Sequence, residues 1–448
     1  MIPLELRLDR GKQQEDDLSW CSTRSPSNES SSRCPQLWTD QEAFNKRTRY
    51  VLFNEVLGGG MKGVVQKGYD SETGKVVAVK RIQCDKDCQV RFVEIQQYGS
   101  DEVLSAEGYA PVDSEATSWS GRLVHDSSNA HAAVAFSHES LAKCIVIVRR
   151  GGGVSFLEKL LNAQRGGAVG VLIVNNEDRA EVYSVGEAEP PLPSVMVTRS
   201  DGDVAIHAAL ACQASNTDSE PSRFGALVSV FTDVQHELAI CRRLPPHPQV
   251  ARVFDAWQDG PSAVLIMEFC RGGKASVSTR STQGLAVALW LIKQMLEGVA
   301  HLHAHGICHR DLKPENMLLT KPLEESGARL VLVDFSMAST AQRMRVPCGS
   351  PRYVAPEVLV GNGYDLPRDL WSVGMVAHEL VFRQHPFDTL SDHEVIRRLS
   401  VGDLPVVQAR ADVPQAVCEL IGNLLQAEPA ARWSAREALE HFREIALP

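Results

Sequence analysis

The sequence is poor in the features that mark several classes of protein. Only 6% of its 448 residues are aromatic, and no uninterrupted apolar run approaches the roughly 18 residues needed to cross a bilayer. The 11 cysteines are scattered, and no CxxC pair or matched histidine pair completes a zinc site. The formal net charge is −10 and no basic stripe stands out. We therefore expect no membrane span, no structural zinc site and no nucleic-acid partner.

The cysteines and the first residues also bear on cellular location. An odd, dispersed set of cysteines is typical of free thiols in a reducing compartment. The first 17 residues are too polar to supply the apolar core of a signal peptide. These features predict a cytoplasmic or nuclear protein.

Composition changes along the chain. Residues 1–47 contain SPSNESSSRCP and QQEDD and few apolar positions, which predicts a disordered tail. From Tyr50 onward, apolar alternation with glycines predicts three strands up to Ile82. The second half has helical periodicity, for example in ALWLIKQMLEGVAHLHAHG, LWSVGMVAHELVF and AVCELIGNLLQ. At roughly 150 residues per domain, the length predicts about three structural units.

The stretch LGGGMKGVV is the first that carries chemistry. Gly58, Gly60 and Gly63 lie between two predicted strands, where backbone amides can approach phosphate oxygens without interference from Cβ atoms. Alone, this GxGxxG spacing is only weak evidence for a phosphate site, because an ordinary glycine hairpin can have the same spacing. Lys80 follows in VAVK at the end of the next strand but one, in a position suited to phosphate oxygens. Together these residues predict a phosphate site.

Two later stretches add carboxylates and an amide in a fixed order. HRDLKPEN offers Asp311 with Lys313 and Asn316, and LVLVDFS places Asp334 on a buried apolar strand. A lone buried aspartate is usually structural. Four such signatures in this order are not expected by coincidence.

With these motifs the sequence resembles the eukaryotic protein kinases over residues 50–90 and 233–446. The resemblance implies an α+β fold, with a strand-rich small lobe, a helical large lobe and ATP between them. It implies that Asp311 is the catalytic base, that Lys313 lies near the transferred phosphate, and that Lys80 pairs with Glu237.

The resemblance also implies the residues that hold the cofactors, ATP and Mg²⁺. The magnesium ligands are Asn316 and Asp334. The residues implied around ATP are Leu57, Gly58, Gly60, Gly63, Val65, Ala78, Lys80, Met267, Glu268, Cys270 and Leu318. Cys241 is expected to pack toward Phe335 and His309, and Glu357 to pair with Arg432.

The residues within the motifs are typical of one class of protein kinase. DLKPEN with Lys313, and Ser350 in CGSPRYVAPE, are typical of serine/threonine kinases and are most similar to the calcium/calmodulin-dependent kinase group. Two positions depart from the pattern. Ser336 replaces the usual glycine after Asp-Phe, and Val346 stands where many kinases carry a phosphothreonine. Ser339 and Thr340 remain as candidate phosphorylation sites or as plain loop hydroxyls.

The kinase pattern is interrupted between Lys80 and Glu237, which are 237 − 80 = 157 positions apart. The stretch CIVIVRRGGGVSFLEKL begins a strand, turn and helix like those of some nucleotide sites, but the third glycine is absent. The segment instead resembles the protease-associated domain over residues 90–231, with Gly153-Val154 in place of a cysteine. Such domains have no catalytic residues of their own and are thought to bind peptides.

The resulting domain plan has five segments. These are a tail (1–47), the small lobe in two parts (48–90 and 232–270), the protease-associated insert (91–231) and the large lobe (271–448). Pairing of the predicted strands 90–96 and 224–230 is expected to bring the ends of the insert together.

Two functions stay open from the sequence. One is an ATP-dependent serine/threonine kinase that acts on protein substrates and is regulated by the insert. The other is a kinase-shaped scaffold that acts through a peptide or protein ligand of the insert. The joint presence of Lys80, Glu237, Asp311, Asn316 and Asp334 favours the first, because a scaffold has no physical need to retain both base and metal ligands.

Overall fold

The computed structural model describes most of the chain from residue 49 onward. The described residues are 49–60, 63–82, 90–97, 103–110, 119–136, 141–142, 144–178, 183, 190–214, 226–231, 233–259, 262–275, 284–340, 344, 348–360, 364–407, 409–443 and 445. The tail 1–47 and Val346, for which the sequence made predictions, lie outside these ranges.

One lobe is built on an antiparallel sheet with the strand order β1-β2-β3-β12-β11. Its strands are β1 (Tyr50–Gly60), β2 (Gly63–Asp70), β3 (Lys75–Ile82), β11 (Val253–Asp259) and β12 (Ser262–Glu268). Ile82 at the end of β3 pairs with Ala263 of β12, so strands from before and after the insert lie side by side. The three strands predicted between Tyr50 and Ile82 are confirmed.

Helix α4 (Asp233–Arg243) completes this lobe. Its apolar residues Val234 and Leu238 pack against Ile82, Ala263 and Leu265 of the sheet. This packing fixes α4 against the face of the sheet that also carries Lys80, because Lys80 and Ile82 are two residues apart on β3.

The insert is a closed barrel with the strand order β10-β4-β5-β9-β8-β7-β6. Its strands are β4 (Val90–Gln97), β5 (Val103–Tyr109), β6 (Trp119–His125), β7 (Cys144–Arg149), β8 (Gly170–Val174), β9 (Ser194–Val197) and β10 (Ala226–Phe231). Its helices are α2 (Phe156–Arg165) and α3 (Arg199–Ala214), with a 3₁₀ turn at Ser127–Asn129. The predicted pairing of first and last strands is confirmed, since β4 and β10 are antiparallel neighbours.

The glycine turn after β7 serves the fold of the insert. Gly151, Gly152 and Gly153 all have positive φ, and a Cβ on Gly152 would lie 2.5 Å from the His131 ring. Lys159 of α2 is buried and donates to the carbonyl oxygens of His131 and Gly151, at 2.5 and 2.9 Å. The positive φ of the three glycines and the approach of His131 to Gly152 account for this turn without a bound nucleotide.

The second lobe is helical. Its helices are α5 (Gly284–Ala304), α6 (Pro356–Val360), α7 (Pro367–Phe382), α8 (Asp392–Ser400), α9 (Gln415–Leu424) and α10 (Ala435–Phe442). A small sheet carries β13 (Gly273–Lys274), β14 (Met317–Leu319) and β15 (Leu330–Leu332), and 3₁₀ turns lie at Pro314–Asn316 and Pro429–Ala431. Among the described helices only α5 is long and apolar enough to cross a membrane, and it packs against α7, α10 and β15 in the core.

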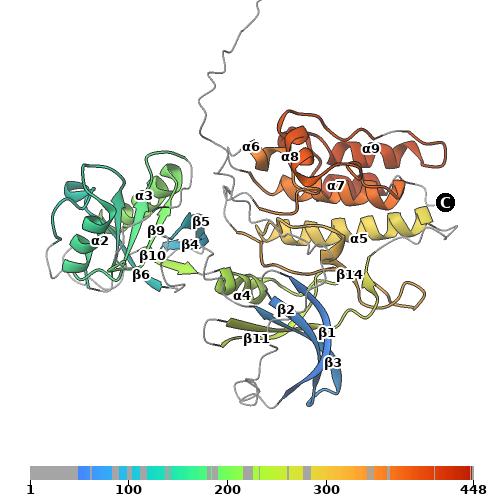
Figure 1. Ribbon diagram of the computed structural model, residues 1–448, viewed down its shortest axis with the longest axis horizontal. Helices are drawn as coiled ribbons and strands as arrows, with labels where there is room; N and C mark the ends of the chain where they lie inside the picture. Colours follow the sequence, from blue (N-terminus) through green and yellow to red (C-terminus); the bar gives the residue numbers. More distant parts are fainter. Residues whose placement is uncertain are drawn as a thin grey trace, which may run out of the picture.

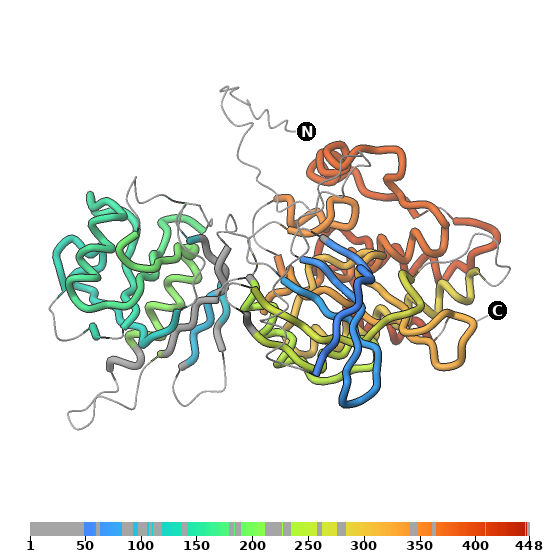
Figure 2. Tube along the Cα trace, turned by 60° about the horizontal axis from the view of Figure 1, so that its bottom comes forward, coloured from blue at the N-terminus to red at the C-terminus, as the bar shows by residue number. Residues whose placement is uncertain are grey.

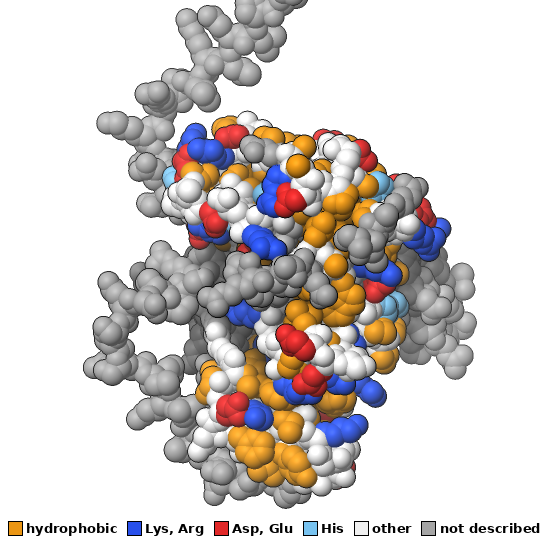
Figure 3. Space-filling view, turned by 90° about the vertical axis from the view of Figure 1, so that its right-hand side faces the viewer, with side chains coloured by type: hydrophobic (Ala, Val, Ile, Leu, Met, Phe, Trp, Pro, Cys, Tyr) orange, Lys and Arg blue, Asp and Glu red, His pale blue; other side chains and the backbone are white. Residues whose placement is uncertain are grey.

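The insert lies to one side of the two lobes. Figure 1 shows α4 between the strands of the insert and the sheet of the strand-rich lobe, and Figure 2 shows the same separation from a second direction. On the face seen in Figure 3, basic and acidic side chains are interspersed with apolar ones. The predicted fold class, a two-lobed α+β fold with an α/β insert, is confirmed.

Candidate active site

Lys80 forms ion pairs with two carboxylates that are distant from it in the sequence. Its Nζ lies 2.7 Å from Glu237 Oε1 and 2.7 Å from Asp334 Oδ1. Lys80 and Glu237 are buried, at 7% and 2% exposure. Burial alone would lower the pKa of Lys80, but the charges of Asp334 and Glu237 outweigh it and raise that pKa. Lys80 also holds the pKa of Asp334 below its usual value against the effect of burial. Lys80 and Asp334 are therefore both charged at neutral pH.

Strand alternation explains the position of Lys80. Val77 and Val79 point to the apolar core on one face of the sheet, so Ala78 and Lys80 point to the other. The register places Ala78 opposite Met267 and Lys80 opposite both Val65 and Leu265. Four residues predicted at the ATP site therefore lie on adjacent strands: Val65, Ala78, Lys80 and Met267.

Asp311 lies at the centre of a second polar cluster. Its carboxylate accepts from Lys313 Nζ at 2.8 Å, from Asn316 Nδ2 at 3.1 Å and from Ser350 Oγ at 2.8 Å. Lys313 Nζ also donates to Ser350 Oγ at 2.9 Å, which closes a triangle with Asp311. Asp311 is buried, so these contacts hold its carboxylate in one orientation.

The backbone around Asp311 is fixed by a buried aspartate from α7. Asp369 accepts from the backbone N–H groups of His309 at 2.7 Å and Arg310 at 2.9 Å, and contacts His303 Nε2 at 3.1 Å. Arg310 has a φ of 69°, an uncommon backbone conformation for a residue other than glycine. The two backbone contacts with Asp369 hold this segment in place, and His303 joins Asp369 to α5.

The hairpin between β1 and β2 requires one of its glycines. Gly63 has a φ of 153°, and a Cβ there would lie 1.9 Å from the carbonyl oxygen of Arg81 on β3. At Gly58 a Cβ would meet no atom within 4 Å. Leu57 and Gly58 are exposed, as expected for residues that contact a ligand above the sheet. Gly60 pairs with Gly63 where the hairpin turns.

The segment after β12 contains the predicted hinge. Glu268 directs its carboxylate to the Arg329 guanidinium, so only its backbone remains for the predicted contact with adenine. Burial raises the pKa of the Cys270 thiol to about 12. Leu318 lies on β14 and pairs with Lys274 and Val331. The structure thus places Leu318 next to the chain that leaves the hinge.

The predicted metal ligands are neighbours through the β14–β15 ladder. Met317 pairs with Leu332, and the Val333 N–H donates to the Asn316 carbonyl oxygen at 3.0 Å, which puts Asn316 beside Asp334. The Asn316 amide nitrogen donates to Asp311, and among the described residues no group donates to Asn316 Oδ1. An amide oxygen and a carboxylate fit the oxygen preference of Mg²⁺. The pair therefore fits the predicted ion.

Comparison with known proteins bears on this arrangement. The protein kinase domain model matches residues 208–442, which are 442 − 208 + 1 = 235 of the 448 residues. The chain belongs to the protein kinase family. The PA domain model matches residues 119–205, so the kinase carries a protease-associated insert as predicted.

Two curated relatives match the kinase at 34% identity. Calcium-dependent protein kinase 24 of Arabidopsis thaliana matches over 215 residues, 47% of this chain and 36% of its own length. Calcium/calmodulin-dependent protein kinase type II subunit delta of Oryctolagus cuniculus matches over 216 residues, 46% of this chain and 40% of its own length. The chain therefore spans well under half the length of these relatives. The predicted likeness to the calcium/calmodulin-dependent group is confirmed.

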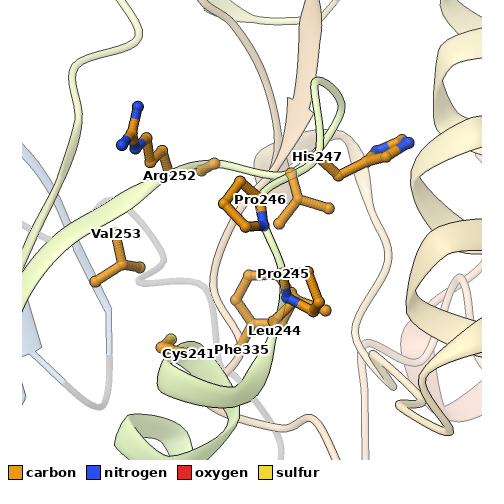
Figure 4. Close-up of a pocket in the computed structure, with 10 residues that line it drawn as sticks. Cys241, Leu244, Pro245, Pro246, His247, Arg252, Val253 and Phe335 are labelled. Atoms are coloured by element: carbon orange, nitrogen blue, oxygen red, sulfur yellow. The ribbon is translucent and has the colours of Figure 1, made fainter.

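A cavity of about 160 Å³ lies between the end of α4, the chain that leads into β11, and Phe335, the neighbour of Asp334. Figure 4 shows Cys241 of α4 and Phe335 among its lining residues. The rings of Phe335 and His309 are 5.3 Å apart, so the three side chains predicted to pack together lie in one region. Burial raises the pKa of the Cys241 thiol to about 12. Ser336 is not among the described residues with positive φ, so its backbone does not require glycine here.

Some contacts of the kinase were not predicted from the sequence. Ser350 was predicted only as a hydroxyl of the serine/threonine class, and its bonds to Asp311 and Lys313 are new. Glu94 of the insert pairs with Arg243 of α4 and was not singled out at all. The sequence signals for this pair were an acidic residue in a predicted strand and basic residues at the end of a predicted helix.

The predicted ion pair of Glu357 and Arg432 is present, with a nitrogen–oxygen distance of 2.7 Å.

Proposed function

We propose that the protein is an ATP-dependent protein serine/threonine kinase that transfers the γ-phosphate of Mg-ATP to protein hydroxyls. The observation that carries the proposal is the formed Lys80–Glu237 pair, at 2.7 Å, together with the bond from Lys80 to Asp334. In protein kinases the lysine–glutamate pair must be formed, and the aspartate at the position of Asp334 must hold Mg²⁺, for phosphoryl transfer.

The residues of the chain divide the work of the reaction. Asp311 accepts the proton of the acceptor hydroxyl and orients that hydroxyl, and Lys313 offers its ammonium near the phosphate that is transferred. Lys80 binds the α and β phosphates. Asn316 and Asp334 would hold Mg²⁺, which when bound neutralises charge on the phosphates.

The choice of serine or threonine is supported by the Ser350 contacts. Ser350 donates to Asp311 and accepts from Lys313, both of which act at the acceptor side of the site. The Ser350 contacts show that one short aliphatic hydroxyl can reach both Asp311 and Lys313. We propose that proteins with exposed serine or threonine hydroxyls are the substrates.

The test is phosphate transfer from radiolabelled ATP to a generic protein acceptor, with ATP binding measured in parallel. We expect Asp311→Asn to lower kcat by about 10²- to 10⁴-fold, because it removes the base, while ATP affinity stays within about twofold. Asp412→Asn is the matched control, since Asp412 is an exposed carboxylate paired only with Arg410 in the described part of the chain. Equal inertness of wild type and Asp311→Asn, with ATP bound to both, would favour the scaffold function.

The PA domain match supports a second role for residues 91–231. We propose that the insert binds a peptide or protein and regulates the kinase. A catalytically weak scaffold that acts only through this ligand is the alternative. We also propose a cytoplasmic or nuclear location, which is supported by the six free thiols among the described residues.

A further inference from the structure

The insert presents two polar residues side by side on its outer surface. In the β4–β5 hairpin Glu94 lies directly opposite Ser105, so both side chains are on the same face. Val93 and Ile95 of β4, and Ala106 of β5, belong to the apolar core of the barrel. Alternation along the strands therefore turns Glu94 and Ser105 outward.

Glu94 makes a bidentate ion pair with Arg243, the last residue of α4. Both nitrogen–oxygen distances are 2.6 Å, and the Glu94 side chain is only 8% exposed. The hydrogen bonds to Glu94 raise the pKa of Arg243. A carboxylate this buried is costly to leave without its partner, and the fork geometry of arginine makes the pair specific. The contact thus fixes the end of α4 to the insert.

The other end of α4 is attached to the insert through the chain itself. Strand β10 ends at Phe231 and α4 begins at Asp233. β10 is also the neighbour of β4, which carries Glu94. The insert therefore holds α4 at both ends, and Glu237 lies between them, about 9 Å along the helix axis from Arg243.

Ser105 reaches the segment that follows the metal-binding aspartate. Thr340 Oγ1 lies 3.2 Å from Ser105 Oγ, and Thr340 is six residues after Asp334. One hairpin of the insert thus contacts both the helix that carries Glu237 and the segment that carries Asp334. These are the two groups that meet at Lys80.

We propose that the β4–β5 hairpin is a clamp that holds α4 and the segment after Asp334 in the arrangement that forms the Lys80 pairs. Glu94 and Arg243 are then positioning residues for Glu237. This inference rests on the proposed kinase function. It implies that the insert supports kinase activity while the hairpin is in place, and that release of the hairpin lowers that activity. A ligand of the insert that displaces the hairpin is an inhibitor.

A double-mutant cycle on the full chain tests the clamp. We expect Glu94→Gln and Arg243→Gln each to lower kcat/KM by at least about fivefold, the low end of typical coupling between sites. The double variant should lose no more than either single variant, because both remove the same contact. Asp203→Asn is the matched control, since it breaks the Asp203–Arg149 pair inside the insert and should leave kcat/KM unchanged.

Hydrogen exchange supplies a readout that is independent of catalysis. In Glu94→Gln we expect faster exchange in residues 233–243 and unchanged exchange in residues 415–424 of α9. Thr340→Val, which keeps the side-chain shape, should speed exchange near residue 340 and also lower kcat/KM. Unchanged kinetics in a folded Glu94→Gln protein, additive losses in the cycle, or unchanged exchange in α4 would each overturn the clamp. If the wild type transfers no phosphate, the proposed kinase function fails, and the exchange data alone decide the clamp.

Discussion

Lys274 and Glu315 form an exposed ion pair, with Lys274 Nζ 3.3 Å from Glu315 Oε1. Glu315 lies four residues after Asp311, so the pair borders the surface where a protein substrate must bind. In basophilic relatives an acidic residue stands at the position of Lys274 and pairs with arginine three positions before the target. The lysine repels such an arginine and also neutralises Glu315.

We therefore expect Lys274→Glu to raise kcat/KM about two- to fivefold for peptides with arginine three positions before the acceptor, the scale of one exposed ion pair. Peptides with alanine there should change little. The measurement is a paired peptide series with the wild type and the variant. Lys293→Glu, on the exposed side of α5, is the control. Strong selection for that arginine by the wild type, or no gain in the variant, would contradict the role of Lys274.

At the level of elements, the β1–β2 hairpin depends on Gly63 for its close approach to β3. An alanine there meets the Arg81 carbonyl oxygen and adopts a positive φ, which costs about 1–3 kcal/mol. We expect Gly63→Ala to lower the free energy of unfolding of the strand-rich lobe by that amount and to weaken ATP binding. Thermal unfolding followed by ATP titration measures both effects.

Gly58→Ala separates the backbone effect from the loss of a glycine as such. Its Cβ would meet no atom within 4 Å, and its φ is not positive. The stability of Gly58→Ala should therefore stay within about 0.5 kcal/mol of the wild type. Equal destabilisation by both substitutions would show that the contact with Arg81 is not the cause.

The elements that sequence predicted are those whose signals are local. Strands β1 to β3, helix α7 and the strand, turn and helix at residues 144–160 follow from apolar periodicity and glycines. The motif residues Lys80, Asp311 and Asp334 were predicted from their local motifs, and Glu237 from the resemblance to the protein kinases. In the structure Lys80 pairs with Glu237 and Asp334, and Asp311 pairs with Lys313.

Contacts that depend on how the insert and the kinase lobes pack together could not be predicted from local sequence patterns. Glu94 and Arg243 are 149 residues apart, and each is an ordinary charged residue in its own element. Their contact depends on the angle between the barrel and α4, which no local pattern encodes. The ion pair between Glu268 and Arg329 likewise depends on tertiary packing, because the two residues are 61 positions apart.

At the level of the whole molecule, the insert and the kinase should behave as coupled bodies. We expect replacement of residues 95–230 by a short flexible linker to leave a folded kinase whose kcat/KM is several-fold below that of the parent. Ser105 is removed, and Glu94 loses the neighbouring strands that hold it beside Arg243. Circular dichroism and ATP titration establish that the shortened protein is folded. Kinetics equal to the parent in such a protein would leave the insert as a docking module without influence on catalysis.

The pairing of β4 with β10 has a consequence for how the chain reaches this fold. Ile82 and Ala263 pair across 263 − 82 = 181 positions, which is a long loop to close from an unfolded chain. Once the barrel has formed, Val90 and Phe231 are held on adjacent strands, and only (90 − 82) + (263 − 231) = 40 positions remain free. The shorter loop lowers the entropic barrier by about 1 kcal/mol. During synthesis the barrel also leaves the ribosome before β11 and β12, so its early folding would prepare the strand-rich sheet to close.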